Sequence, residues 1–121
     1  MIGVGIDLVE LRRFRQVLAR RPGVADRLFT DAERRSLSGR RDPVPGLAAR
    51  FAAKEAAMKA LGVGIGAVSF RELEVRRLES GAPLLWVSGR AAELAGRLGV
   101  ESFHLSLSHT EETASAVVVA R

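Results

Sequence analysis

Two carboxylates and two lysines are the residues of this chain whose types and positions could do chemistry. Asp7 lies among small and apolar residues near the start, and Glu55 lies beside Lys54 and close to Lys59. Two carboxylates from separate elements, completed by water and substrate phosphate, form the kind of oxygen-ligand set that suits Mg²⁺. Zinc is disfavoured, because the chain has only two histidines and no cysteine.

Both lysines belong to a segment that is predicted to be a helix from about Leu47 to Leu61. Alanine, leucine, methionine, lysine and glutamate favour helix, and Gly62 favours its end. Spacings of four and three residues define one helical face, which consists of Leu47, Phe51, Lys54, Met58 and Leu61. A lysine within such an apolar stripe must reach solvent or pair with an anion. If the anion is a phosphate, we expect methionine to be tolerated in place of Lys54.

Three cations of this helix, Arg50, Lys54 and Lys59, are candidates for holding phosphate oxygens, the lysines as point charges. Glu55 and Lys59 are one turn apart and lie on the same side of the helix. The alternative interpretation is an ordinary amphipathic helix with an exposed Glu55–Lys59 pair, which contributes roughly 0.2–0.5 kcal/mol.

Residues 2–9 are predicted to form a strand. One face carries the apolar residues Ile2, Val4, Ile6 and Leu8. The other face carries Gly3, Gly5 and Asp7, and glycines beside a carboxylate let another group approach the backbone closely. The alternative is an exposed strand aspartate without a function.

The remaining pattern predicts an α+β fold in a single domain, residues 1–121, with a small antiparallel sheet packed against helices on one side. Thr30 and Glu33 have the spacing of a capping box and are expected to open a short helix. The other expected elements are helices 10–19 and 88–98, a loop over 38–46, strands 70–78 and 84–87 joined as a hairpin, and strands 102–108 and 114–120. Alternating strands with short turns argue against a parallel doubly wound sheet.

The net charge of +5 is concentrated in one segment and indicates an anionic partner. Residues 11–41 hold ten arginines against three carboxylates, a net charge of +7. Arg13 and Arg20 are two helical turns apart and share the exposed side of the first predicted helix, which Arg21 extends. Nucleic acid and an acidic protein both fit such a surface, and a solvated helix face is the third interpretation.

Composition narrows the class of protein. A hydrophobic content of 47 % with 27 % charged residues is ordinary for a globular domain with one core. No apolar run approaches the roughly 18 residues of a membrane helix, and the N-terminus has no secretory pattern. Because cysteine is absent, a disulfide framework is excluded, and we expect a cytosolic location.

Three glycines alternate in residues 62–66, where backbone freedom would let a ligand approach. The segment is not a P-loop, because no Gly-Lys-Ser or Gly-Lys-Thr follows. Gly62 and Gly64 are candidates for contact with a phosphate-bearing ligand, and a flexible turn is the alternative.

Three motifs together resemble the holo-acyl-carrier-protein synthase family of 4′-phosphopantetheinyl transferases. They are GVGID at residues 3–7, RFAAKEA at residues 50–56 and SLSHT at residues 106–110. The resemblance covers essentially the whole chain, and it implies a homotrimer with active sites at subunit interfaces. The implied reaction is the Mg²⁺-dependent transfer of 4′-phosphopantetheine from coenzyme A to a serine of apo-acyl carrier protein. Adenosine 3′,5′-bisphosphate would be the other product, and the reaction would support fatty acid biosynthesis.

The same resemblance implies roles for individual residues. Asp7 and Glu55 would bind the metal, and Lys59 would contact the phosphates. Glu55, directly or through a metal-bound water, is the candidate that accepts the serine proton. The coenzyme would lie near Ser108, His109 and Thr110, and His109 remains a competing base.

Two further points concern the partners. The family usually has Gly-Lys-Pro at the hairpin turn, and Ala82 stands here in place of the lysine, so any role of that lysine is absent. An acidic carrier protein would dock on Arg13, Arg20 and Arg21.

Two other function classes stay open. One is a nucleic-acid or nucleotide-binding module without catalysis, built on the arginine-rich segment. The other is a metal-dependent phosphohydrolase that uses the same two carboxylates. The resemblance favours the transferase, with coenzyme A and acyl carrier protein as partners and with neither nucleic acid nor membrane among them.

Overall fold

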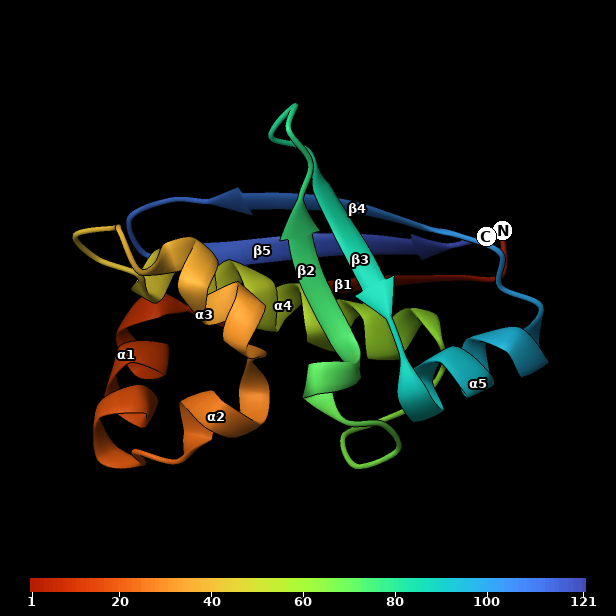
Figure 1. Cartoon of the computed structure of the whole chain (residues 1–121), viewed down its shortest axis with the longest axis horizontal. Helices are drawn as coiled ribbons and strands as arrows, with labels where there is room; N and C mark the ends of the chain where they lie inside the picture. Colours follow the sequence, from red (N-terminus) through yellow and green to blue (C-terminus); the bar gives the residue numbers. More distant parts are fainter.

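The computed structural model describes all of residues 1–121 and consists of five helices, five strands and one 3₁₀ turn (Figure 1). In chain order they are β1 (Gly3–Glu10), α1 (Leu11–Arg20), α2 (Val24–Leu28), α3 (Asp31–Leu37), α4 (Val44–Ala60), η1 (Phe70–Glu72), β2 (Leu73–Arg77), β3 (Pro83–Val87), α5 (Gly89–Leu98), β4 (Phe103–His109) and β5 (Thr113–Ala120). None of the helices is long and apolar enough to span a membrane.

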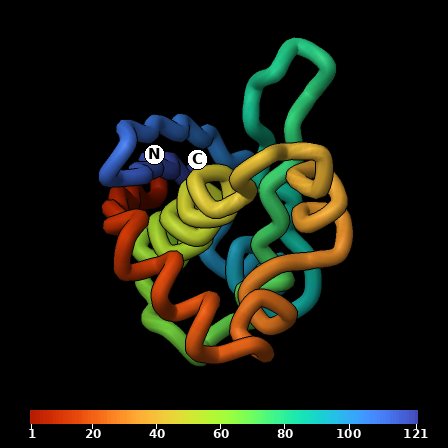
Figure 2. Tube along the Cα trace, turned by 90° about the vertical axis from the view of Figure 1, so that its left-hand side faces the viewer, coloured from red at the N-terminus to blue at the C-terminus, as the bar shows by residue number.

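The strands form two antiparallel sheets, and α4 lies between them. One sheet has the strand order β1-β5-β4, and the other is the β2–β3 hairpin. Figure 2 shows α4 in the middle, with β1, β4 and β5 on one side and the hairpin on the other. The predicted α+β fold with antiparallel strands packed against helices is confirmed, although there are two small sheets where one was expected.

The glycines of β1 allow α4 to pack directly on the strand backbone. A Cβ atom built on Gly3 would lie 1.9 Å from the carbonyl oxygen of Ala60, and one on Gly5 would lie 1.8 Å from that of Ala56. The helix contributes small side chains to this contact, and its buried alanines are Ala48, Ala49, Ala52, Ala53, Ala56, Ala57 and Ala60. The group that approaches the glycine face of β1 is therefore the protein's own central helix.

The opposite face of β1 is apolar and exposed. Side chains alternate as predicted, but Ile6 is 59 % exposed and Leu8 is 68 % exposed. Val117 of β5 pairs with Ile6 in the sheet register and is also exposed. The sheet β1-β5-β4 therefore has a covered inner face against α4 and an uncovered outer face that is apolar along β1 and at Val117 of β5.

The structure differs most from the sequence-based expectation at three places. Helix α4 begins at Val44 within the predicted loop, because Pro45 suits the first helical turn and Asp42 accepts a hydrogen bond from the Val44 N–H at 3.1 Å. Residues 70–72 form a 3₁₀ turn before the strand. The five-residue helix α2 was not predicted.

The capping box that opens α3 is confirmed. The Glu33 N–H donates to Thr30 Oγ1 at 3.2 Å, and the Thr30 N–H donates to Glu33 Oε1 at 3.0 Å.

Aromatic rings join the N-terminal helices to α4. The rings of Phe14 and Phe51 stack at 5.4 Å between centroids, and Phe29 meets Phe14 edge-on at 6.3 Å. Helix α1 therefore packs against α4 at Phe51, about one turn before Glu55, and Phe29, which follows α2, packs against α1.

Candidate active site

Asp7, Glu55 and Lys59 come together where β1 crosses α4. Lys59 Nζ lies 3.1 Å from Asp7 Oδ1 and donates a second hydrogen bond to the Ile6 carbonyl oxygen at 3.0 Å. Glu55 lies one turn before Lys59 on α4 and lines the same hollow as Asp7. The alternative interpretation, an exposed Glu55–Lys59 pair, is wrong, because Lys59 pairs with Asp7 across the two elements.

This hollow, called the carboxylate hollow below, has a volume of about 540 Å³. Its polar residues are Asp7, Glu55, Arg13 and Glu10, and its apolar wall includes Phe51. Sequence reasoning missed Glu10. Strand alternation assigns Glu10 to the face opposite Asp7, and it reaches the hollow because the chain turns into α1 immediately after it.

The pKa of Glu55 is raised above its ordinary value of 4.5. Burial of the carboxyl group is the larger cause, and the negative charge of Asp7 is the second, while Lys59 partly opposes both. Two carboxylates that repel one another in a half-buried hollow are a favourable place for a cation. No cluster of three or more acidic, histidine or cysteine side chains could hold a metal ion.

Lys54 does not belong to this site. Its side chain is fully buried, its Nζ lies 2.6 Å from Glu33 Oε1, and it also donates to the carbonyl oxygens of Leu28 at 2.7 Å and Phe70 at 2.9 Å. Burial lowers the pKa of Lys54, and the charge of Glu33 opposes that shift. All three ammonium hydrogens are used inside the fold, so the prediction that Lys54 binds phosphate is wrong.

Arg50 is also enclosed, with 2 % of its surface exposed. Its guanidinium donates to the Gly46 carbonyl oxygen and to Ser36 Oγ, both at 3.2 Å, and its Nε has no partner. Burial lowers the pKa of Arg50, and the only carboxylate that opposes this shift is Glu33. A side chain with so little accessible surface does not reach the carboxylate hollow, and the structure contradicts the predicted phosphate contact.

His109 and Thr110 lie in a second hollow of about 470 Å³ with Arg15, Asp42 and Pro45. This hollow shares no lining residue with the carboxylate hollow. The register Val9–Ala114–His109 places His109 two strands away from β1, which is about 10 Å. One chain therefore does not bring His109 and Thr110 to Asp7 and Glu55.

The other coenzyme candidates lie apart from the carboxylate hollow too. Ser108 is exposed and pairs with Ser115 in the sheet register. Gly62 adopts a positive φ of 74° directly after the end of α4, and Gly64 lies in the loop that follows. Their contacts with coenzyme stay predictions.

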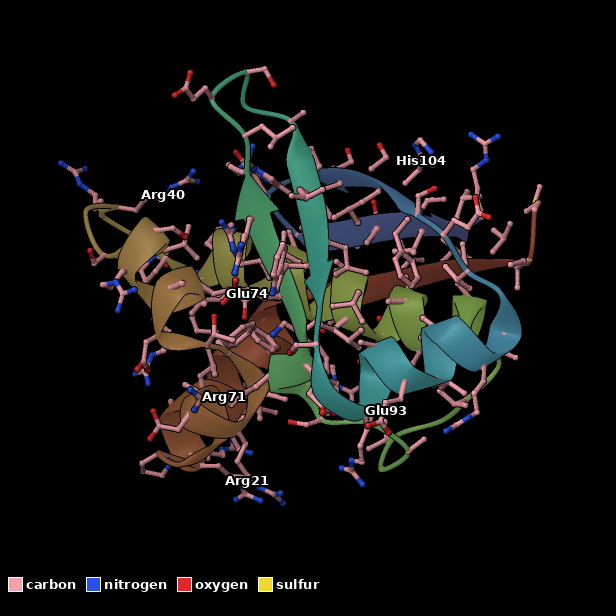
Figure 3. All side chains as sticks on the ribbon, turned by 45° about the vertical axis from the view of Figure 1, so that its right-hand side comes forward. Arg21, Arg40, Arg71, Glu74, Glu93 and His104 are labelled. Atoms are coloured by element: carbon pink, nitrogen blue, oxygen red, sulfur yellow. The ribbon has the colours of Figure 1, made fainter.

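A third hollow of about 450 Å³, called the arginine hollow below, is lined by Arg13, Arg20 and Arg21 with Gln16 and Val17. The predicted sharing of one exposed side by these arginines is confirmed, and Arg21 points away from the ribbon at the end of α1 (Figure 3). Arg13 and Val17 also line the carboxylate hollow. The arginine hollow therefore lies next to the carboxylate hollow and shares two lining residues with it.

A family model described as the 4′-phosphopantetheinyl transferase superfamily matches residues 3–118. The chain belongs to this superfamily. A holo-[acyl-carrier-protein] synthase of Streptomyces avermitilis is 52 % identical over 120 residues, which cover 99 % of this chain and 97 % of that protein.

Solved structures of the superfamily share the fold of this transferase. The holo-[acyl-carrier-protein] synthase of Neisseria meningitidis is 37 % identical, with a TM-score of 0.91 over 100 % of this chain and 99 % of that one. The synthase of Helicobacter pylori, solved in complex with coenzyme A, is 31 % identical, with a TM-score of 0.85 over 98 % and 99 % of the two chains.

Proposed function

We propose that this transferase moves the 4′-phosphopantetheine group of coenzyme A to a serine hydroxyl of an apo-acyl carrier protein. Adenosine 3′,5′-bisphosphate leaves, and the holo carrier protein serves fatty acid biosynthesis. The observation that carries the proposal is that Asp7 and Glu55 line one hollow, with Lys59 paired to Asp7, in a chain that belongs to this superfamily. Two carboxylates and one ammonium suit a reaction at a pyrophosphate.

Asp7 and Glu55 fit a magnesium ion, because hard oxygen ligands of small number leave room for water and phosphate oxygens. Mg²⁺ held there would neutralise negative charge on the pyrophosphate as the leaving group departs. Lys59 has one ammonium hydrogen beyond its two contacts and a side chain that is 55 % exposed, so it can reach a phosphate oxygen.

Glu55 is the residue we assign to accepting the serine proton. A carboxylate with a raised pKa is a stronger base than an ordinary one, and Glu55 has that property through burial and the nearby charge of Asp7. Its position at the carboxylate hollow also leaves it open to a hydroxyl that arrives from the arginine side.

The acidic carrier protein docks on Arg13, Arg20 and Arg21. Exposed arginines attract an acidic partner and set its orientation. Because the arginine hollow and the carboxylate hollow are neighbours that share Arg13 and Val17, a carrier seated on the arginines would have its serine close to Glu55.

The active enzyme is a homotrimer. The uncovered apolar face of β1 and β5 is suited to a second copy of this chain, since such a face is costly to leave in water. A neighbouring copy could also bring its His109 and Thr110 to the coenzyme beside Asp7 and Glu55, which one chain does not do.

Intact-mass analysis of an acyl carrier protein tests the proposal directly. The carrier is incubated with this protein, coenzyme A and Mg²⁺, and it should gain one phosphopantetheine group, roughly 340 Da from its formula. Asp7→Asn and Glu55→Gln keep the shape of each side chain and should each lower the rate by about 10² or more while the fold stays intact. No mass gain with wild-type protein would overturn the proposal, and near-normal turnover of either variant at low Mg²⁺ would overturn the metal assignment.

A further inference from the structure

Lys59 has an unusual position for a residue expected to meet a phosphate. Its ammonium group contacts two oxygens of β1, Asp7 Oδ1 at 3.1 Å and the Ile6 carbonyl oxygen at 3.0 Å. The Asp7 side chain is only 14 % exposed, whereas that of Lys59 is 55 % exposed. The carboxylate is therefore held in place, and the lysine reaches it from solvent on a flexible stem.

The charges of the hollow are unequally paired. Asp7 makes an ion pair with Lys59, while Glu55 makes none, although Glu55 and Lys59 are one turn apart on the same side of α4. The remaining ion pairs of the chain lie elsewhere: Arg15–Asp42, Arg34–Asp26, Lys54–Glu33, Arg71–Asp31 and Arg76–Glu74. Lys59 is thus the cation that neutralises the first of the two carboxylates.

We propose that Lys59 couples the binding of metal to the binding of coenzyme, an inference that rests on the proposed function. In the free protein its ammonium neutralises Asp7 and competes with a divalent cation for that carboxylate. The pyrophosphate of coenzyme A offers the same ammonium a more negative partner. When Lys59 moves to the phosphate, both carboxylates become available to the metal.

The coupling has a thermodynamic consequence in both directions. A ligand that removes Lys59 from Asp7 must raise the affinity for metal, and metal must raise the affinity for that ligand by the same factor. Lys59 suits this exchange because a lysine ammonium is a compact charge on a stem that rotates freely, and its exposed side chain needs no rearrangement of the core to move.

The test measures metal binding rather than turnover. Mn²⁺ is titrated calorimetrically into the intact wild-type protein and into Lys59→Met, each with and without coenzyme A. Without coenzyme A, Lys59→Met should bind Mn²⁺ about tenfold more tightly, because one adjacent positive charge typically changes the affinity of a carboxylate for a cation by at least that factor. With coenzyme A, the wild type should gain affinity for Mn²⁺, and Lys59→Met should gain markedly less.

Arg13→Met is the matched control, because Arg13 lines the same hollow without contacting Asp7. If Arg13→Met gained as much Mn²⁺ affinity as Lys59→Met, the loss of any nearby positive charge would explain the gain, and the proposal would be overturned. Equal or weaker binding by Lys59→Met would overturn it too, since Lys59 would then orient Asp7 for the metal. Circular dichroism checks that each variant is folded.

Failure of this inference differs from failure of the proposed function. If wild-type protein modifies the carrier and binds Mn²⁺ but Lys59→Met shows no gain, only the coupling is wrong. If wild-type protein neither modifies the carrier nor binds Mn²⁺, and Lys59→Met does not bind it either, both are wrong.

Discussion

Lys54 Nζ lies 2.6 Å from Glu33 Oε1, and both side chains are completely buried. Glu33 also accepts hydrogen bonds from the Thr30 N–H through Oε1 and, at 2.9 Å, from the Val75 N–H through Oε2. One ion pair therefore joins α3, α4 and β2 at the residue that precedes Glu55. Lys54 therefore stabilises the fold around the site and does not bind the ligand.

Replacing Lys54 by methionine should destabilise the protein, contrary to the expectation from the apolar stripe alone. The variant leaves the buried carboxylate of Glu33 without its cation, which costs about 3–5 kcal/mol. Urea unfolding measures the loss. The double variant Lys54→Met with Glu33→Gln should recover part of it, because no charge is then left unpaired. Unchanged stability of the single variant would contradict the structural role.

The raised pKa of Glu55 predicts that this residue lowers the stability of the metal-free protein. Such a carboxyl group is protonated in both states well below its ordinary pKa of 4.5; its penalty grows as pH rises above that value and is complete above the higher folded-state pKa. In the presence of a chelator, Glu55→Gln should therefore melt higher than wild type by about 2 °C at pH 8. The difference should vanish at pH 4. A gain that persists at pH 4 would show that the amide packs better for another reason.

Reversing the charges of Arg20 and Arg21 should weaken the binding of carrier protein and leave the binding of coenzyme A unaffected. These two arginines line the arginine hollow but not the carboxylate hollow, whereas Arg13 lines both. Arg20→Glu with Arg21→Glu should raise the KM for carrier protein about tenfold and leave the KM for coenzyme A almost unchanged. Added salt should imitate the effect in wild type, because exposed charges are screened beyond about 10 Å at 0.1 M.

Arg35→Glu is the matched control for charge, because Arg35 is exposed on α3 and lines neither hollow. It should leave both KM values close to wild type. Equal losses for both substrates in the Arg20 and Arg21 variant would indicate a defect of folding or assembly. No loss for either would place the carrier elsewhere.

Gly5→Ala should disrupt the contact that places Asp7 against α4. The new methyl carbon would lie 1.8 Å from the carbonyl oxygen of Ala56, so strand and helix must separate. We expect a loss of about 3 kcal/mol, the upper end for an overpacked site, together with a loss of transfer activity. Gly39→Ala is the control, since a Cβ there meets nothing within 4 Å. Thermal melting compares the two, and equal stabilities would contradict the close packing.

Ile6→Glu should dissociate the proposed trimer without unfolding the chain. Ile6 is 59 % exposed in one chain, so a charged side chain there is tolerated by the monomer fold. Sedimentation velocity should show a smaller species than wild type, and transfer activity should fall with it. Leu98→Glu, at an exposed apolar residue of α5, should change neither. A wild-type protein that sediments as a monomer at full activity would refute the trimer.

The sequence alone determined the features that depend on local chemistry. The Thr30–Glu33 capping box and the β2–β3 hairpin follow from residues a few positions apart, and the structure has both. The residue types of Asp7 and Glu55 were enough to suggest a metal and a phosphate reaction. The ordered motifs indicated the superfamily, which the comparisons confirm.

Tertiary structure decided which partner each charged side chain meets and which face of each element is covered. Lys54 pairs with Glu33 twenty-one residues away, and Lys59 reaches Asp7 across fifty-two residues. On β1 the apolar face is exposed, because the alanines of α4 pack where only glycines let a helix backbone approach. The alternation of residues along β1 shows that its two faces differ. Which face is buried depends on how closely the backbone of α4 can approach, and that contact exists only in the folded chain.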